Sequence, residues 1–336
     1  MAEIIGGEFK RNELNAKSMG GTEVLTMKLA ERANKDLLKE CQIVSSRIKN
    51  DLDGDKIRIF WAHDLPGDPE SDFLKTQYGK DKFHKFVFVS NWQMQNYINA
   101  YNLPWSKCIV LRNFIDPIEE HDKPNPNEQI NLIYHTTPHR GLNILSAVFE
   151  KLCEKHKNLH LDVYSSFALY GWEQRDKEYA EVFKRLESNS QVTNHGTKSN
   201  DEIRDALKKS HIFAYPSIWQ ETSCLSLMEA MSSKNLCVHS NYGSLYETAS
   251  HWTNMYQYYE DLNSHAGAFY NMLDLTIENY KAMYANAGPT KVYTDTFYSW
   301  SNREAEWNSL LSALVNSIQD RSLPEDRGEI FSYSTG

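Results

Sequence analysis

Short runs of apolar residues recur along the chain, and stretches with the spacing of an amphipathic helix separate most of them. Leu142, Leu145, Phe149 and Leu152 mark one such helix, because residues three and four apart lie on one helical face. Strands that alternate with helices are typical of a parallel sheet with helices on its faces. The pattern therefore predicts an α/β fold. The runs expected to be strands are 42–46, 57–61, 86–90, 109–111, 130–134, 160–166, 212–215 and 236–240.

A polar segment near residue 120 is the best linker in the chain. It runs from Glu119 to Asn127 and contains two prolines. A chain of 336 residues is long enough for two domains of ordinary size. We therefore expect one domain over 1–120 and a second over 124–300. The tail 323–336, rich in Pro, Gly, Ser and charged residues, is expected to be poorly ordered.

Composition narrows the class of protein. Hydrophobic residues make up 40% of the chain and charged residues 24%, as in soluble globular proteins. A net charge of −9 argues against a nucleic-acid binder that relies on phosphate contacts. No apolar stretch approaches the roughly 20 residues that span a bilayer, and the N-terminus lacks a signal-peptide pattern. The five scattered cysteines, without C-x-x-C or H-E-x-x-H, predict a cytoplasmic protein without disulfides or structural zinc.

The stretch with the clearest chemistry runs from Pro216 to Met231. It follows the strand expected at 212–215, enters a helix, and carries Glu221 and Glu229 eight positions apart. A turn at a helix N-terminus binds anions, because its backbone N–H groups and the helix dipole point at the turn. Carboxylates beside it accept hydrogen bonds from hydroxyls. A nucleotide sugar offers both groups, a diphosphate and hydroxyls on either side.

Each glutamate also has a plainer interpretation. Glu229 fits a capping box with Ser226, in which the carboxylate only satisfies backbone donors at the helix start. Glu221 can be a solvated loop acid.

The segment resembles the E-x7-E motif of retaining glycosyltransferases of family 4, which have the GT-B fold. The likeness lies in the glutamate spacing, in Pro216-Ser217 before it and in Glu229-Ala230-Met231 at its end. It implies that Glu221 contacts the transferred sugar and Glu229 the nucleotide ribose. The turn residues Thr222, Ser223, Cys224 and Leu225 would then bind the donor. Glu221-Thr222-Ser223-Cys224 stands where the family has E-G-F-G.

A second loop resembles the diphosphate site of this family. Arg140-Gly141 matches a lysine–glycine pair that holds the donor diphosphate, with arginine in place of lysine. His135, next to Thr136, occupies the position of the family's arginine. A neutral imidazole brings no charge, so this change bears on how strongly diphosphate is held. The alternative for Arg140 is a surface arginine at a turn.

Three further positions follow from the resemblance. The segment around His195 and Gly196 matches the part that frames the nucleotide base with backbone groups. Gly20 and Gly21 match a glycine loop that faces the donor phosphates and the acceptor, although a tight turn before a helix would look the same. His63, after the strand at 57–61, is the candidate for a histidine that contacts the donor sugar, and it can equally be structural.

The resemblance implies two Rossmann-like domains that face each other across a cleft, with a helix over about 301–320 that crosses back to complete the N-terminal domain. It implies transfer of a sugar from a nucleotide diphosphate sugar with retention of anomeric configuration. No cofactor and no metal are expected, because protein cations replace the divalent ion and no D-x-D pair follows a strand.

The acceptor is expected to be a carbohydrate, a lipid-linked molecule or a small molecule, with at most weak membrane association, and not a nucleic acid. Two alternatives stay open. One is a degenerate GT-B protein that binds a nucleotide or carbohydrate without transfer, and the other is a nucleotide-sugar hydrolase or epimerase.

Overall fold

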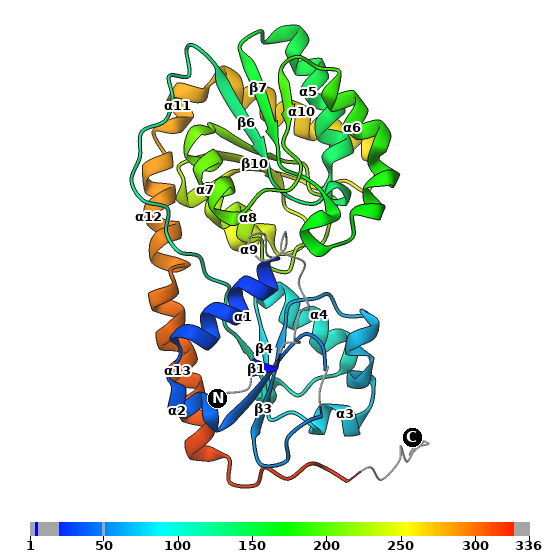
Figure 1. Cartoon of the computed structure of the whole chain (residues 1–336), viewed down its shortest axis with the longest axis vertical. Coiled ribbons are helices and arrows are strands. Elements are labelled where there is room, and N and C mark those ends of the chain that lie inside the picture. Colours follow the sequence, from blue (N-terminus) through cyan, green and yellow to red (C-terminus); the bar gives the residue numbers. More distant parts are fainter. Residues whose placement is uncertain (1–3, 6–19, 49–50, 326–336) are drawn as a thin grey trace. The chain divides into compact units, whose positions relative to one another are not determined.

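A computed structural model describes residues 4–5, 20–48 and 51–325 of the chain. The residues fall into two compact units, which are drawn in Figure 1. Of the described residues, unit 1 holds 4–5, 22–48, 51–113 and 301–325, and unit 2 holds 20–21 and 114–300. Residues 326–336 of the expected tail lie outside the described ranges.

Unit 1 is built on one parallel sheet whose strands lie in chain order, β1-β2-β3-β4-β5. Its strands are β1 (Ile4–Ile5), β2 (Cys41–Ser45), β3 (Ile57–Ala62), β4 (Lys85–Phe88) and β5 (Cys108–Val110). Its helices are α1 (Gly21–Arg32), α2 (Lys35–Lys39), α3 (Gln77–Asp81), α4 (Asn91–Tyr101) and α13 (Trp300–Ser317), with the 3-10 turns η2 (Pro69–Lys75) and η3 (Trp105–Lys107).

Side chains of successive strand residues point to opposite faces of this sheet, so each face gathers its own core. Phe60 and Phe86 pack with Phe83 on the face that also holds residues of α4. Trp61, the neighbour of Phe60, contacts Trp307 of α13 with ring centroids 5.0 Å apart. The last helix of the chain is therefore part of unit 1, whose strands come from the first third of the sequence.

The segment after α13 is also fastened to unit 1. Arg58 of β3 is fully buried and donates hydrogen bonds to backbone carbonyls from two segments that are far apart in the sequence. They include Asp53 O at 2.9 Å and Arg321 O at 2.7 Å. Arg321 in turn pairs with Glu40 at 2.7 Å. A buried guanidinium with several carbonyl partners is satisfied without a buried carboxylate.

Unit 2 holds a second parallel sheet, with the strand order β11-β10-β9-β6-β7-β8. The chain builds β6, β7 and β8 outward in one direction and then returns to place β9 on the other side of β6. Its strands are β6 (Ile130–Tyr134), β7 (Leu159–Val163), β8 (Val192–Asn194), β9 (Ile212–Tyr215), β10 (Leu236–Ser240) and β11 (Asn254–Tyr256). The boundary between β6 and β9 is thus a topological switch point, where open α/β sheets bind ligands outside the carboxyl ends of the strands.

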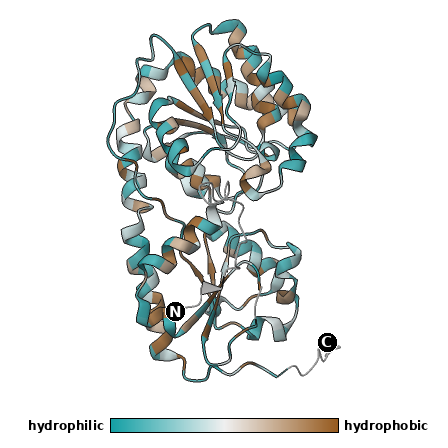
Figure 2. Ribbon diagram, in the orientation of Figure 1, coloured by the Kyte–Doolittle hydropathy of each residue, from teal (hydrophilic) through white to brown (hydrophobic). Residues whose placement is uncertain are grey.

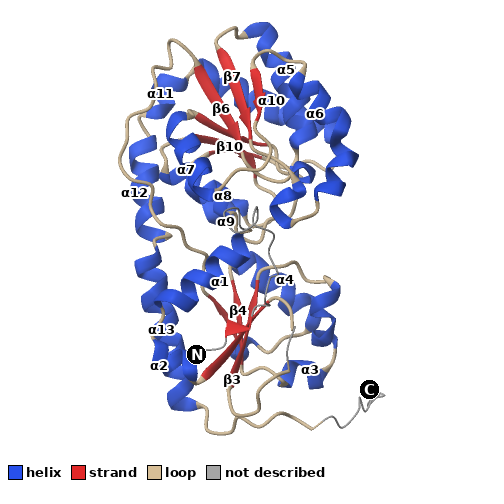
Figure 3. Ribbon diagram, in the orientation of Figure 1, coloured by secondary structure: helices blue, strands red, loops and turns tan. Residues whose placement is uncertain are grey.

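Helices cover both faces of the second sheet, as Figure 3 shows. Leu145, Phe149 and Leu152 of α5 are buried, which confirms the apolar stripe expected there. In Figure 2 the strands of both sheets are mostly hydrophobic. The helices of unit 2 are α5 (Leu142–Lys155), α6 (Ala180–Glu187), α7 (Asn200–Lys209), α8 (Leu225–Ser232), α9 (Leu245–Ala249), α10 (Leu262–Glu278), α11 (Tyr280–Tyr284) and α12 (Ala287–Phe297), with the 3-10 turns η4 (Pro138–Arg140), η5 (Phe167–Tyr170) and η6 (Glu173–Tyr179).

The α/β architecture expected from the apolar runs is confirmed, and β6, β9 and β10 match their predicted ranges to within one residue. The short strands β8 and β11 were not among the expected runs, because polar residues leave their three positions without an apolar run. Among the described residues, no helix is long and apolar enough to cross a membrane.

Candidate functional site

An ion pair joins the two loops that leave the switch point of unit 2. Arg140 ends η4 in the loop after β6, and Glu221 lies in the loop after β9. Arg140 Nη1 is 2.5 Å from Glu221 Oε1. The Glu221 side chain is 6% exposed, whereas the Arg140 side chain is 23% exposed. The pair places a cation and a carboxylate where the fold is expected to bind a ligand.

Two glycines let neighbouring loops approach the segment that carries Glu221. Gly141 has φ +128°, and a Cβ there would lie 2.2 Å from the carbonyl oxygen of Pro216. Gly243 has φ +65°, and its Cβ would lie 2.5 Å from the backbone N of Glu221. The backbone of Ser244 also donates a hydrogen bond to Glu221 O at 2.7 Å. The loops after β6, β9 and β10 are therefore packed backbone against backbone, which only glycine allows at these two positions.

Glu221 has a second partner, the hydroxyl of Tyr215 at the end of β9. Tyr215 is fully buried and donates its hydroxyl hydrogen to the same Oε1 that pairs with Arg140. Burial and the adjacent Glu221 carboxylate raise the pKa of Tyr215 well above its ordinary value, so the phenol stays protonated. Burial alone would lower the pKa of Arg140, but Glu221 and Tyr215 outweigh it and hold that pKa well above its ordinary value. The site carries a fixed carboxylate and a fixed cation.

Polar atoms without hydrogen-bond partners occur in the loops after β6 and β8. Within the described part of the chain, His135 Nε2, Thr136 Oγ1 and Thr197 Oγ1 are buried and unpartnered. Burial lowers the pKa of His135 to about 4, so its imidazole is neutral at pH 7. The helices α5 and α8 begin nearby in the chain, at Leu142 and Leu225, and no side chain caps either N-terminus. Unsatisfied donors at helix starts are suited to an anion.

Glu229 lies inside α8, whereas Glu221 lies in the loop before this helix. Its Oε1 is 3.2 Å from Nη1 of Arg204 in α7, and Nη2 of Arg204 donates to Pro117 O at 3.1 Å. The Glu229 side chain is 23% exposed. The capping box considered for Glu229 does not form, because Cys224 is the N-cap of α8 and Ser226 lies inside the helix.

His195 follows β8 and is held from two sides. Its Nε2 is 2.7 Å from Asp162 Oδ1, and its ring stacks on Tyr164 with centroids 4.3 Å apart and planes at 5°. Gly196 has φ +63° and no atom within 4 Å of a built Cβ. Because the Asp162 carboxylate and the Tyr164 ring both hold His195, the loop after β8 has a defined position.

With this geometry in hand, the chain can be compared with known proteins. The sequence profile of the family described as "Glycosyl transferases group 1" matches residues 116–286, just over half of the chain. The chain belongs to glycosyl transferases group 1. No curated protein matches this glycosyltransferase by sequence.

Solved structures of glycosyltransferases share its fold. A glycosyltransferase from Rickettsia africae ESF-5 has 14% sequence identity and a TM-score of 0.67, with 94% of this chain and 85% of that chain covered. Anabaena Alr3699/HepE in complex with UDP-glucose has 15% identity and a TM-score of 0.60, covering 78% and 73%. A trehalose-phosphate synthase (UDP-forming) from Burkholderia vietnamiensis has 8% identity and a TM-score of 0.62, covering 82% and 72%. The expected GT-B fold, with two Rossmann-like domains, is confirmed.

The remaining candidate residues of this glycosyltransferase lie elsewhere in the chain. Gly20 precedes α1 and Gly21 is its first residue. His63 follows β3 in unit 1, where its ring is 4.4 Å from that of Trp61 and burial lowers its pKa to about 3. In unit 2, Thr222, Ser223 and Cys224 form the turn between Glu221 and α8, and Cys224 is buried. The roles expected for these residues stay predictions.

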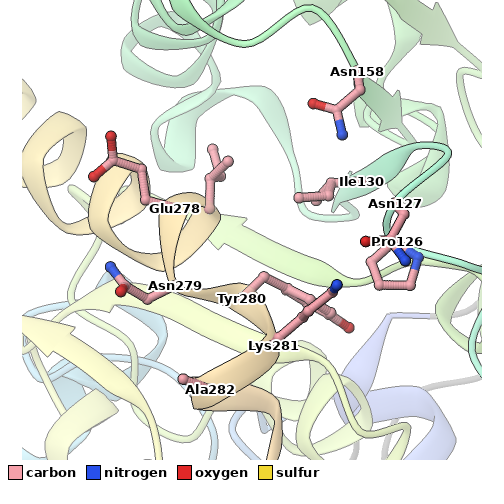
Figure 4. A pocket seen from close by; sticks show the side chains of 10 residues that line it. Pro126, Asn127, Ile130, Asn158, Glu278, Asn279, Tyr280, Lys281 and Ala282 are labelled. Carbon is pink, nitrogen blue, oxygen red and sulfur yellow. The ribbon is translucent and has the colours of Figure 1, made fainter.

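A pocket and a group of potential metal ligands lie at the amino ends of the strands of the second sheet. A pocket of about 430 Å³ opens beside Ile130, Asn158 and Tyr280, as Figure 4 shows. Because Ile130 begins β6 and Asn158 precedes β7, the pocket lies at the amino ends of the strands, away from Arg140.

Near this pocket, His156, Asp274 and Glu278 bring three potential metal-ligand atoms within 4.8 Å of one another. Lys155 Nζ already pairs with Asp274 at 2.7 Å and with Glu278 at 2.6 Å. The ammonium group of Lys155 therefore already supplies these two carboxylates with the positive charge that a metal cation would bring.

Three residues of the site escaped the sequence reasoning. Tyr215, which fixes Glu221, looked like the last apolar residue of a strand. Arg204, which pairs with Glu229, was not among the candidate residues. Trp219, whose ring lies 5.8 Å from the guanidinium of Arg140, lies inside the Pro216–Met231 stretch but was not singled out there.

Proposed function

We propose that this glycosyltransferase transfers a sugar from a nucleotide diphosphate sugar to an acceptor with retention of configuration, in the manner of family 4. The observation that carries the proposal is the Arg140–Glu221 ion pair across the switch point of unit 2. A donor needs a cation for its diphosphate and an acceptor group for its sugar hydroxyls. Both are present there in fixed positions.

The leaving group sets what the site must do. As the bond to the sugar breaks, negative charge grows on the diphosphate, and donors that are already oriented stabilise it most. Arg140 supplies a charged fork that can hold two phosphate oxygens, and the starts of α5 and α8 supply backbone N–H groups. His135 would add one uncharged hydrogen bond, because its imidazole is neutral.

In this proposal the two glutamates bind different parts of the donor. Glu221, held by Arg140 and Tyr215, would accept hydrogen bonds from hydroxyls of the transferred sugar. Glu229, at the side of α8 that meets Arg204, would accept hydrogen bonds from the ribose. The leaving phosphate would take the proton of the acceptor on the same face of the sugar, so no separate catalytic base is required.

We take a UDP-sugar as the first donor to test. The structure of Anabaena Alr3699/HepE contains UDP-glucose, and the enzyme from Burkholderia vietnamiensis is a UDP-forming synthase. Transfer is proposed to need no divalent metal, because Arg140 and the helix starts can neutralise the diphosphate. A cytoplasmic location and a carbohydrate acceptor fit such a donor and are proposed with it.

The decisive experiment is thermal unfolding in EDTA with UDP, GDP, ADP and TDP, with the variant Arg140→Met alongside. A ligand at about one hundred times its Kd adds roughly 2.7 kcal/mol to the stability of the folded protein. This raises Tm by several degrees in a protein of this size. We expect a shift with UDP that Arg140→Met abolishes and that Arg185→Met, on the exposed side of α6, retains. Absence of a shift with every nucleotide would refute the proposed donor site.

A second measurement separates transfer from the alternatives. Proton NMR of a reaction with UDP-glucose and candidate acceptors reports the anomeric configuration of the product. A new glycoside of the donor's configuration supports retaining transfer. Free glucose at the same rate with and without acceptor would indicate a hydrolase, a changed sugar still on UDP an epimerase, and binding without any product a degenerate binder.

A further inference from the structure

Ser46 locks together the loops that follow β2 and β3 in unit 1. It is buried and has φ +60°, a left-handed backbone conformation that is strained for a serine. Its Oγ accepts hydrogen bonds from the backbone N of His63 at 2.7 Å and from that of Asp64 at 3.3 Å. Its backbone N donates to Trp61 O at 2.9 Å. Backbone strain persists only where the surrounding structure enforces it, and it is concentrated at functional sites.

The lock at Ser46 brings a cation and a carboxylate together. Arg47 follows Ser46, and its Nε lies 3.8 Å from Asp64 Oδ2. This is the longest ion pair among the described residues of unit 1, and it is too long for a hydrogen bond. The two side chains are 42% and 36% exposed. No other group in the described ranges pairs with the Arg47 guanidinium, so its N–H donors are available to a ligand.

Asp64 is held in a half-buried position without a close cation. Burial raises the pKa of its carboxyl above the ordinary value, and Arg47 offsets this only in part. The main chain is fixed as well, because Asp64 O accepts a hydrogen bond from Gln93 Nε2 at 2.8 Å. A carboxylate that is fixed and partly desolvated, but not closely paired, is suited to accept hydrogen bonds from a ligand.

The place of this pair in the sheet is that of a ligand site. Arg47 follows β2 and Asp64 follows β3, and parallel α/β sheets bind ligands outside the carboxyl ends of their strands. Unit 2 supplies the proposed donor pair, Arg140 and Glu221, at the carboxyl ends of its own strands. A transferase also needs a site for the acceptor, and the carboxyl ends of β2 and β3 provide one in unit 1.

From this geometry we propose that Arg47 and Asp64 bind the acceptor, and that the acceptor is an anionic saccharide. A guanidinium holds a carboxylate or a phosphate with two parallel N–H donors. The Asp64 carboxylate would accept hydrogen bonds from hydroxyls of the same sugar. A uronic acid and a sugar phosphate both carry an anion and hydroxyls in one molecule. The inference rests on the proposed function, because it takes the donor of the transfer to be bound by unit 2.

Matched probes separate the charge of the acceptor from its hydroxyls. For each of glucose, galactose and mannose, the methyl glycoside, its uronic acid and its 6-phosphate are titrated into full-length protein with excess UDP. Binding is followed by ligand-observed NMR. We expect one set in which an anionic member binds about tenfold or more tightly than the neutral glycoside. Whether the uronic acid or the phosphate binds better identifies the anion.

Arg47→Gln is the informative variant. It should weaken the preferred anion by about tenfold and leave the neutral glycoside unchanged. Arg47→Lys, which keeps the charge but not the planar fork, should retain part of the preference. Asp64→Ala should weaken the neutral glycoside too, because that probe shares the hydroxyls. The matched control is Lys39→Gln, which removes one positive charge from an exposed pair with Asp36 at the amino end of β2. It should bind every probe as wild type does.

UDP binding by thermal shift is measured on the same samples, so that the two proposals can fail separately. A normal UDP shift without binding of any anionic probe, or with a preference for anions that Arg47→Gln retains, would overturn the acceptor site and leave the donor site standing. Loss of the UDP shift in Arg47→Gln would assign this arginine to the donor and also overturn the inference. An anion preference that depends on Arg47, in a protein that binds no nucleotide, would support the saccharide site and refute the proposed donor.

Discussion

Tyr215 and Arg140 approach the same carboxylate oxygen of Glu221, one from the end of β9 and the other from the loop after β6. Tyr215 is fully buried, and the Arg140 side chain is 23% exposed. The carboxylate is therefore held by two elements of unit 2 that are far apart in the sequence.

Removing the buried anchor should lower both the stability of the protein and its rate of transfer. In Tyr215→Phe, Glu221 loses one hydrogen bond to a charged group, which is worth about 1.5–3 kcal/mol. We expect UDP-sugar turnover to fall about tenfold while UDP still binds. The matched control is Tyr134→Phe, which removes a buried hydroxyl whose partner is the carbonyl of Thr137 at 3.0 Å. Equal turnover by the two variants, measured with unfolding curves on both, would show that Tyr215 does not position Glu221.

The two glutamates should separate binding from transfer. Glu229→Ala removes a carboxylate proposed to meet the ribose, so the Kd for UDP should rise about tenfold or more by calorimetry. Glu221→Gln should leave that Kd within a few-fold and reduce transfer much more strongly. Glu154→Ala, an exposed glutamate on α5, serves as the control. If both site variants bind UDP and turn over donor as wild type does, the assignment of the E-x7-E segment is wrong.

A methyl group at Gly141 should disrupt the site through the backbone. Its Cβ would lie 2.2 Å from Pro216 O, and its φ of +128° is strained for any other residue. We expect Gly141→Ala to lose about 1–3 kcal/mol of unfolding free energy and to lose UDP binding. Gly267→Ala is the control, because Gly267 lies inside α10 with open space around it. That variant should gain up to about 1 kcal/mol. A Gly141→Ala protein as stable as wild type would contradict the close contact of the two loops.

Donor binding should not gain from protonation of His135. Burial lowers the pKa of His135 to about 4, so the imidazole stays neutral between pH 8 and pH 5.5. The phosphates of UDP-glucose keep their charge over that range, and we expect its affinity, measured by calorimetry, to show no rise near pH 6.5. A rise there that His135→Gln removes would mean that the histidine becomes charged and takes over the role of the family's arginine.

Acid should destabilise the protein through its buried histidines. Burial lowers the pKa to about 3 for His63 and to about 4 for His135 and His239. The unfolded chain takes up these protons near pH 6.5 and the folded protein only at much lower pH. Stability is therefore fully present above pH 6.5 and is lost as the pH falls toward 4, by up to about 1.4 kcal/mol per pH unit for each histidine. Urea unfolding at pH 7.5, 6 and 5 measures the slope, and a flat profile would contradict it.

Local patterns carried much of what could be foreseen. The apolar runs at 130–134, 212–215 and 236–240 became β6, β9 and β10 because a buried strand needs only a short run of apolar residues. The stripe of α5 became a buried helical face for the same local reason. The resemblance to a known family singled out Glu221, Glu229 and Arg140-Gly141. Their residue types and spacing match motifs that bind a nucleotide sugar in that family.

Proximity across the sheet was decided only by the tertiary structure. Arg140 and Glu221 are 81 residues apart, and they meet because β9 pairs with β6 after the chain has already built β7 and β8. The partners Tyr215, Arg204 and Trp219 likewise depend on which element packs beside which. Periodicity along a chain records which face of an element is buried, whereas long-range strand pairing and backbone contacts such as Gly141 on Pro216 determine what that face meets.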